Sequence, residues 1–436
     1  MTQTIECETA ARWVVRMVIP RRRARDSWRM KIDEERLSSL LEEVNRFGTL
    51  DSGGVERLAW TEPEIAARRW LADRCRDEGF EVEFDEAGNV WAFAGRRPAV
   101  MLGSHLDTVP NGGRFDGALG IVSALETLLS ARAANAPGWE HLGLLCFTDE
   151  EGVRFGLGMT GSRALAGDLT TDEVEAAASA SGTKLSAVLR DAGFDPARVG
   201  DATRRRDDVR AWLEVHVEQG RRLERAGLPT GIVTGIVGLS HWRIEASGEA
   251  NHAGTTLPDD RHDALLPVAA AAIEAQRVMR ATDSLVATVG EAEVVGGATN
   301  IVPGLARATL DVRSLDEALI DRATERILGA VREAATDNGC RLQVQETKRL
   351  RAAPMDERVL EAMHAAAGEM DSDVPEMPSM AGHDAMTLAG AGIPCGMIFV
   401  RSAGGVSHSP LESSTASDCV AGAELLSRTA LRLALL

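Results

Sequence analysis

Short apolar runs alternate with amphipathic stretches along most of the chain. Four runs are apolar enough for strands buried on both faces, at residues 100–102, 142–147, 211–217 and 395–400. Apolar residues at helical spacing predict helices at residues 32–47, 66–79 and 120–134. Strands that alternate with helices in this way favour an α/β fold built on a mainly parallel sheet.

The segment from residue 234 to residue 346 has a different pattern. It predicts strand, helix, strand, strand, helix and strand, at residues 242–246, 263–279, 285–295, 306–312, 315–335 and 342–344. This β-α-β-β-α-β order is that of a small ferredoxin-like α+β domain. We therefore predict one catalytic domain made of residues 31–233 and 347–436, with a second domain, residues 234–346, inserted between them.

Residues 1–30 lie outside this pattern. The apolar residues Val14, Val15, Met17, Val18 and Ile19 precede the cluster Arg21, Arg22, Arg23 and Arg25, whereas a secretory signal carries its positive charge first. We expect a disordered or upstream-extended start, with Met30 as a natural alternative first residue.

Composition excludes several classes of partner. The 436 residues include 48 Lys and Arg against 66 Asp and Glu, a formal net charge of −18, so a nucleic-acid partner held through phosphate contacts is not expected. No apolar run reaches the roughly 18–20 residues that span a bilayer, so no membrane partner is expected either. The six cysteines contain no Cys-x-x-Cys pair, which favours reduced thiols in a cytoplasmic protein.

Polar residues follow each of the four buried runs. In chain order they are His105 and Asp107 with Asp116 after a glycine-rich loop, then Glu150 and Glu151, then Glu214, His216 and Gln219, and last Ser407 and His408. Open α/β sheets build their sites at the carboxyl ends of parallel strands, so we expect these side chains to converge. His141, His241, His262 and His364 lack this context and are interpreted as ordinary histidines.

Three imidazoles with carboxylates and no nearby thiolate are the ligand set of a catalytic metal site. One bridging carboxylate allows two ions about 3.5–4 Å apart, which can polarise a carbonyl together. Asp107, two residues after His105, is placed to accept the other ring N–H of that histidine. Of the adjacent Glu150 and Glu151, one can bind metal while the other carries protons.

Two competing motifs carry less weight. Residues 156–161 match G-x-G-x-x-G, but the nearest strand is expected to stop near Phe147 and residues 160–162 do not obviously open the helix of a dinucleotide-binding unit. The chain contains no G-x-S-x-G, so a serine-hydrolase elbow has no candidate.

With these residues in view, the chain resembles the metal-dependent amidohydrolases that act on allantoate, N-carbamoyl-L-amino acids and β-ureidopropionate, within the wider aminoacylase and carboxypeptidase superfamily. The resemblance runs from about Lys31 to the C-terminus. It rests on ordered motifs at residues 53–57, 103–108, 149–152, 214–220, 251–256, 382–385 and 407–408.

The resemblance implies a role for each matching residue. His105 and His216 would bind one of two divalent ions, Asp116 would bridge both, and Glu151 and His408 would bind the second. Glu150 would be the general base, with Asp107 and His252 as the other catalytic residues. The substrate contacts carried over are Gln219, His252, Asn300, Arg313 and the backbone at Gly382. His383 is equally consistent with a supporting and a purely structural role.

The implied function is hydrolysis of the ureido C–N bond of an N-carbamoyl amino acid, which gives the amino acid, CO2 and ammonia. Peptide-cleaving relatives typically offer an acidic residue where this chain has His216, so His216 favours a ureido substrate with a carboxylate. Allantoate hydrolysis is the near alternative, and an N-acyl amino acid deacylase, a dipeptidase and a non-catalytic binding protein are the others. Zinc, manganese, cobalt and nickel all suit the ligands. The resemblance also implies that the inserted domain serves as a lid and forms a homodimer.

Overall fold

The computed structural model describes residues 16–17 and 30–436, which divide into two compact units. Within the described residues, unit 1 comprises residues 16–17, 30–234 and 355–436, and unit 2 comprises residues 235–354. The chain leaves unit 1 within strand β7 (Thr230–Ile236) and returns to it after β14 (Ala353–Pro354).

Unit 1 is built on a mixed sheet with the order β1-β15-β7-β16-β6-β4-β5-β3-β2. Its four central strands are parallel: β16 (Cys395–Val400), β6 (Val209–Val217), β4 (Ala99–His105) and β5 (Leu142–Phe147). The flanking strands are β1 (Arg16–Met17), β15 (Pro375–Ser379), β3 (Val90–Phe93) and β2 (Glu81–Phe84). Every residue of β4, β5 and β16 is buried, as their continuous apolar sequences require. The α/β class is therefore confirmed, with the parallel strands at the centre of the sheet.

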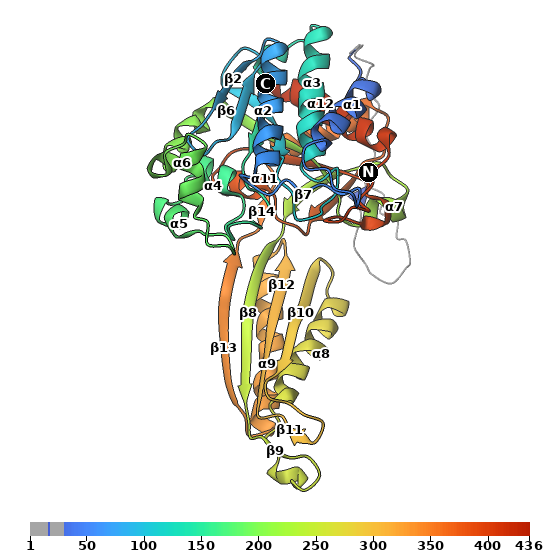
Figure 1. The fold of residues 1–436 in the computed structure, drawn as a ribbon. Helices are drawn as coiled ribbons and strands as arrows, with labels where there is room; N and C mark the ends of the chain where they lie inside the picture. Colours follow the sequence, from blue (N-terminus) through green and yellow to red (C-terminus); the bar gives the residue numbers. More distant parts are fainter. Residues whose placement is uncertain (1–15, 18–29) are drawn as a thin grey trace. The chain divides into compact units, whose positions relative to one another are not determined.

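Five helices share one hydrophobic core with this sheet: α1 (Glu34–Asn45), α2 (Glu62–Asp77), α3 (Ala118–Ala133), α10 (Glu357–Glu369) and α12 (Ala416–Ala434). Helix α3 is buried at nearly every position because it packs against β4, β5 and β6 as well as against α1 and α12 (Figure 1). This explains why its sequence is apolar all round instead of on one stripe.

A smaller cluster of helices packs separately in unit 1. It contains α4 (Thr160–Ala166), α5 (Thr171–Ala176), α6 (Leu185–Asp191) and the 3-10 segment η2 (Pro196–Asp208), and it shares a second core with Trp60. Helix α4 begins at Thr160, well after β5 has ended at Phe147, which agrees with the expectation that residues 160–162 do not open the helix of a dinucleotide-binding unit. Helices α7 (Arg222–Ala226) and α11 (Asp384–Gly390) and the 3-10 turns η1 (Trp139–His141) and η4 (Ala403–Gly405) complete the unit.

Unit 2 has one four-stranded antiparallel sheet with the order β10-β12-β8-β13. Its elements in chain order are β8 (Gly238–Ser247), α8 (Leu265–Ala281), β10 (Leu285–Val294), β12 (Leu305–Ser314), α9 (Glu317–Asp337) and β13 (Arg341–Leu350). Both helices share one core with the sheet, and Figure 1 shows them on the same face of it. Alternate residues of β12 are buried because only that face is covered. A two-stranded ribbon, β9 (Asn251–His252) with β11 (Ile301–Val302), and the turn η3 (Pro258–Asp260) complete the unit.

The expected disorder of residues 1–30 falls largely outside the described residues. Of that segment, Arg16 and Met17 pair with β15, and Met30 is buried against the main core. The helices of the described chain include none that is long and apolar enough to cross a membrane. The five cysteines in the same residues, Cys75, Cys146, Cys340, Cys395 and Cys419, are free thiols.

Candidate metal centre

The four central strands deliver the predicted ligands to one edge of the sheet. His105 is the last residue of β4, and His216 is the penultimate residue of β6. Glu150 and Glu151 lie three and four residues after the end of β5, and His408 lies in the loop after β16. Because these strands are parallel neighbours, their carboxyl ends meet at the same place.

The first ligand group contains His105, His216 and Asp116, and all three are buried. Oδ1 of Asp116 lies 3.5 Å from Nε2 of His105 and 3.1 Å from Nε2 of His216. The Nδ1 atoms of the two rings lie 3.0 Å and 2.9 Å from the backbone carbonyl oxygens of Asp107 and Val217. These carbonyls hold a hydrogen on each Nδ1, so both Nε2 atoms are directed at the shared carboxylate.

The second ligand group contains the same aspartate with Glu151 and His408. Nε2 of His408 lies 3.5 Å from Oδ2 of Asp116 and 3.7 Å from Oε2 of Glu151. Nε2 of Gln219 donates to the same Oδ2 at 2.8 Å. Asp116 thus faces one group with each of its oxygens, which is the arrangement that a bridging ligand requires.

Asp107 connects the two loops that carry the site. Its Oδ1 accepts the backbone N–H of Glu150 at 3.1 Å, and its Oδ2 accepts that of Glu151 at 3.1 Å. The nearest acceptor for Nδ1 of His105 is the Asp107 backbone carbonyl at 3.0 Å, while the carboxylate that we expected in this role lies at 3.5 Å. The carboxylate instead fixes the turn that presents both glutamates.

Glu150 is positioned for proton transfer. Its Oε2 lies 3.8 Å from Nε2 of His105, and 11% of its side chain is exposed. Burial raises the pKa of Glu150 well above its usual range, and the negative charges of Glu151, Asp384 and Asp107 raise it further against the effect of His105. A carboxyl with a raised pKa can both take and return a proton near neutral pH.

The backbone at the site adopts conformations that side chains rarely take. Asp149, Gln219 and His408 have φ values of 52°, 56° and 53°. Such left-handed residues cost roughly 1–2 kcal/mol each and collect at functional sites. Gly117, beside Asp116, has φ of 63°, and a Cβ there would lie 2.5 Å from Cε1 of His105, so only glycine fits.

Several buried residues around the ligands were not assigned roles by the sequence. The ring of His383 packs edge-on against that of His216, with centroids 4.5 Å apart, and its Nε2 pairs with the Ser379 hydroxyl at 2.9 Å. Burial lowers the pKa of His383 well below its usual value, so this ring is neutral. His383 therefore supports His216, and the preceding Gly382 is exposed at the same place. Glu412 and Ser407 both contact Asp116, the first through its backbone N–H and the second through its carboxylate.

The remaining predicted contacts lie in unit 2. His252 and Asn300 are exposed and share the β9–β11 ribbon, where His252 pairs with Ile301 and the Asn300 carbonyl accepts the N–H of Ala253. Arg313 lies near the end of β12, and its Nε and Nη2 donate to Asp311. The structure thus brings His252 and Asn300 together and separates both from Arg313.

The donor set fits divalent ions. Nε2 of His105 is buried and has no hydrogen-bond partner among the described residues, as expected of an atom that serves as a metal ligand. The imidazole and carboxylate donors, with no thiolate in either group, suit zinc, manganese, cobalt and nickel. His105, His216 and Asp116 would hold one ion, and Asp116, Glu151 and His408 the other.

Metal binding is expected to release protons. Burial alone would lower the pKa of His216, but the Asp116 carboxylate outweighs it and raises the pKa to about 9 in the chain without metal. An ion that binds Nε2 at pH 7.5 must displace this proton. Titration calorimetry of zinc binding in buffers of different ionisation enthalpy measures the release, and a binding heat independent of the buffer would contradict the prediction.

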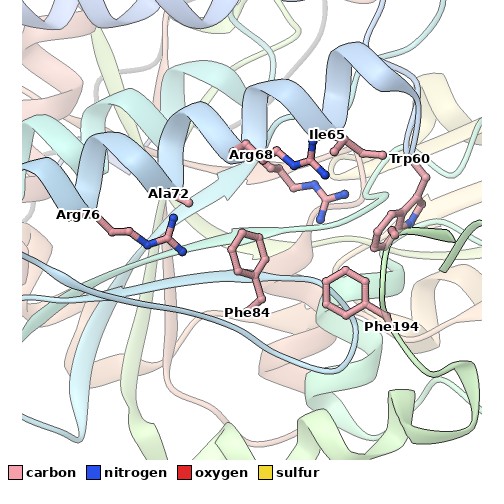
Figure 2. A pocket seen from close by; sticks show the side chains of 9 residues that line it. Trp60, Ile65, Arg68, Ala72, Arg76, Phe84 and Phe194 are labelled. Carbon is pink, nitrogen blue, oxygen red and sulfur yellow. The ribbon is translucent and has the colours of Figure 1, made fainter. Parts of the chain in front are cut away.

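A cavity of about 280 Å³ elsewhere in unit 1 is not part of this site (Figure 2). It lies between α2 and the rings of Trp60, Phe84 and Phe194. Two of the arginines that line it already interact with other residues of the chain. Arg68 pairs with Glu64 and packs over Trp60, and Arg76 pairs with Asp73.

The chain is similar to known proteins over most of its length. Residues 101–432 match the family described as peptidase family M20/M25/M40. The chain is 39% identical over 407 residues to an N-carbamoyl-L-amino acid amidohydrolase of Geobacillus stearothermophilus, covering 92% of this chain and 99% of that protein. It is 31% identical to an allantoate amidohydrolase of Bacillus subtilis, over 91% and 97% of the two chains. A solved amidase of the hydantoinase/carbamoylase family from Burkholderia multivorans superposes with a TM-score of 0.86 at 30% identity, over 94% and 99% of the chains.

Proposed function

Because this chain belongs to peptidase family M20/M25/M40, we propose that it is an amidohydrolase that cleaves the ureido C–N bond of N-carbamoyl-L-amino acids. Water adds to the carbamoyl carbon, the C–N bond to the amino acid breaks, and the amino-acid nitrogen takes a proton. The carbamic acid that leaves gives CO2 and ammonia. The similarity to the Geobacillus enzyme over nearly the full length of both chains supports this substrate class.

One observation carries the proposal: Asp116 lies between two groups of metal donors, the first buried and the second including the exposed His408, with one oxygen toward each. We propose that two divalent ions bind there, drawn from zinc, manganese, cobalt and nickel. When bound, such ions polarise the carbonyl and make water acidic enough to attack near neutral pH. Glu150, beside the first group, takes the proton from that water and returns it to the departing nitrogen.

His252 is prepared to donate a hydrogen bond to a developing oxyanion. Its Nδ1 accepts the backbone N–H groups of Gly254 and Thr255, both at 3.1 Å. The hydrogen of the neutral ring therefore sits on Nε2, which is exposed with the rest of the side chain. A fixed N–H donor of this kind stabilises a tetrahedral intermediate. Asn300, on the same ribbon, and Gln219 and the Gly382 backbone in unit 1 are the further contacts that we propose for the substrate.

Replacement of Arg313 by lysine is expected to weaken the binding of carboxylate substrates. Lysine keeps the charge but loses the two-pronged geometry that matches a carboxylate, so kcat/KM should fall about 10- to 100-fold, mainly through KM. The measurement is the change in kcat and KM for N-carbamoyl amino acids, compared with the change for their amide derivatives, which lack the carboxylate. Arg307→Lys, on the same strand and paired with Glu245, is the matched control. Equal losses for acid and amide substrates would count against this role.

The unit 2 contacts imply that two copies share each site. Arg313 lies eight residues along β12 from Leu305, the end of the strand nearest the ribbon, or about 27 Å at ~3.4 Å per residue. A substrate of amino-acid size cannot touch both Arg313 and His252 of one copy. We therefore propose a homodimer in which His252 and Asn300 of one copy complete the site of the other.

Mixing two inactive variants tests this sharing. Consider a mixed dimer of one Glu150→Gln chain and one His252→Ala chain. If the copies share sites, one of its two sites has both Glu150 and His252 intact. Activity should then return in the mixed dimers. If each chain supplied its own His252, every site would lack one residue, and the mixture would stay inactive.

A substrate panel tests the reaction itself. Ammonia release from the metal-loaded protein should be fastest with an N-carbamoyl-L-amino acid, and slow or absent with the D-isomers, N-carbamoyl-β-alanine and allantoate. Hydrolysis of N-acetyl amino acids and dipeptides gives no ammonia, so amino-acid release is measured for these compounds in parallel and should be slow or absent. Preference for allantoate would favour the activity named for the Bacillus subtilis relative. Reaction with the acetyl compounds or with dipeptides alone would replace the proposal by a deacylase or a peptidase.

A cytoplasmic location remains our prediction, and the free thiols are consistent with it.

A further inference from the structure

Glu412 joins the two loops that carry the second ligand group. It lies four residues after His408, and only 4% of its surface is exposed. Its Oε2 accepts the backbone N–H groups of Phe115 and Asp116, at 3.0 Å and 3.3 Å. Its Oε1 accepts from the Ser407 hydroxyl at 3.1 Å. A single buried carboxylate thus holds the backbone of the Asp116 loop and the residue that precedes His408.

The Ser407 hydroxyl lies between two carboxylates. Its Oγ is 3.1 Å from Oδ2 of Asp116 and 3.1 Å from Oε1 of Glu412. A hydroxyl has one hydrogen, so Ser407 donates to one carboxylate at a time. Gln219 supplies a second donor to Asp116, which leaves the serine hydrogen available to Glu412. This hydrogen bond therefore ties Ser407, the residue before His408, to Glu412, while Gln219 holds Asp116 Oδ2, the oxygen that faces His408.

The Asp116 loop is shaped to let Glu412 approach. A Cβ on Gly113 would lie 1.7 Å from Oε2 of Glu412, so no other residue fits without displacing the carboxylate. The loop of His408 is closed at its base, where the N–H of Ala403 donates to the carbonyl of Ser413 at 2.8 Å. Glu412 therefore connects two well-formed loops instead of ordering one loose segment.

We propose that Glu412 is a positioning residue that holds Asp116 and His408 at the separation needed to bind the second ion. The inference rests on the proposed two-ion site and adds to it a residue that touches neither metal nor substrate. Partners of metal ligands typically contribute 10- to 100-fold to metal affinity. We expect that loss for the ion of the Asp116, Glu151 and His408 group, with the ion of the His105 and His216 group retained.

The test measures zinc affinity and stoichiometry by competition with a chromophoric chelator, together with the visible absorption of the cobalt-loaded protein. Glu412→Ala and Glu412→Asp should each bind the second ion about 10- to 100-fold more weakly. Glu412→Gln should bind it within a few-fold of the unmodified chain, because its amide oxygen can accept both backbone N–H groups and its amide nitrogen can donate to Ser407. Ser407→Ala, which leaves the backbone contacts in place, should show a smaller loss and serves if Glu412→Ala does not fold.

Glu126 provides the matched control. It is also a buried glutamate that accepts a backbone N–H, that of Asp33, but it lies on α3 and pairs with Arg36. Glu126→Ala should lower the melting temperature without changing metal affinity. The inference would be overturned by a second-ion affinity that is unchanged in folded Glu412→Ala, Glu412→Asp and Ser407→Ala, or that is reduced equally in Glu126→Ala. Absence of a second ion from the unmodified chain would instead reject the proposed two-ion site.

Discussion

Glu150→Gln is expected to bind metal like the unmodified chain and to lose about 10²–10⁴-fold in kcat. Glutamine has nearly the same shape as glutamate, but its amide cannot accept a proton from water or return one to the leaving nitrogen. Nothing in the geometry makes Glu150 a ligand, since the two ligand groups are completed by Glu151 and His408 on one side and by His105 and His216 on the other. The measurement is kcat with a saturating N-carbamoyl amino acid, alongside the metal content of the purified variant.

Glu151→Gln distinguishes the roles of the adjacent glutamates. It should lose the second ion and activity together, because it removes a charged donor of the Asp116 and His408 group. Glu361→Gln, on the exposed face of α10, should change neither and serves as the control for purification and folding. If Glu150→Gln lost metal while Glu151→Gln kept it, the assignments would have to be exchanged.

Much of the site could be predicted because its residues lie beside strong local patterns. His105, His216 and the Glu150–Glu151 pair follow apolar runs that can only be buried strands, and parallel strands bring their carboxyl ends together. Asp116 and His408 lie farther from their strands; they too were expected at this edge, but the resemblance to a family was needed to assign their roles as ligands. The parallel order of β16, β6, β4 and β5 then accounts for their convergence.

Glu412 shows why the rest could not be predicted. Two of its three partners are backbone N–H groups nearly 300 residues away in the chain, and a backbone group leaves no mark on the amino-acid sequence. Asp107 shows the same limit. Its spacing from His105 predicted a position beside the ring, and its carboxylate lies 3.5 Å from Nδ1, but the spacing did not predict that the carboxylate accepts N–H groups of the next strand's loop. Side chains that bind backbone across the fold are visible only once the topology is known.

The inserted segment illustrates the opposite case. Alternating burial along β12 and the amphipathic α9 follow from a sheet covered on one face, so the order of elements could be read from periodicity. The short ribbon of β9 and β11 could not, because each strand has two residues and carries no periodic pattern. The pairing of His252 with Ile301, and with it the neighbouring position of Asn300, comes from the structure alone.

Removal of metal is expected to abolish activity and to make stability depend on pH. After dialysis against a chelator, the ammonia-release rate should fall to a few per cent or less and return when zinc or manganese is added, because the Lewis-acid chemistry is lost with the ions. A fully active metal-free protein would reject the mechanism. Restoration by several of the four candidate ions would agree with a donor set of imidazoles and carboxylates.

The pH dependence of the stability of the metal-free protein arises because its ligand side chains bind protons where the metal ions would otherwise bind. Burial and the charge of Asp116 raise the pKa of Glu151 to about 7, and Asp116 raises the pKa of His216 to about 9 against the effect of burial. Both values exceed those of the unfolded chain, roughly 4.3 and 6.5, so the folded metal-free protein binds more protons than the unfolded one between about pH 4.5 and 9. The stability of the metal-free protein should therefore fall as pH rises through this window. The stability of the metal-loaded protein, whose ions have displaced these protons, should not fall in the same way.

The melting temperatures of the two forms at pH 6 and pH 8.5 measure this difference. The melting temperature of the loaded form should exceed that of the metal-free form by more at pH 8.5 than at pH 6. A gap that narrows toward pH 8.5 would mean that these carboxyl and imidazole groups do not hold protons in place of the ions.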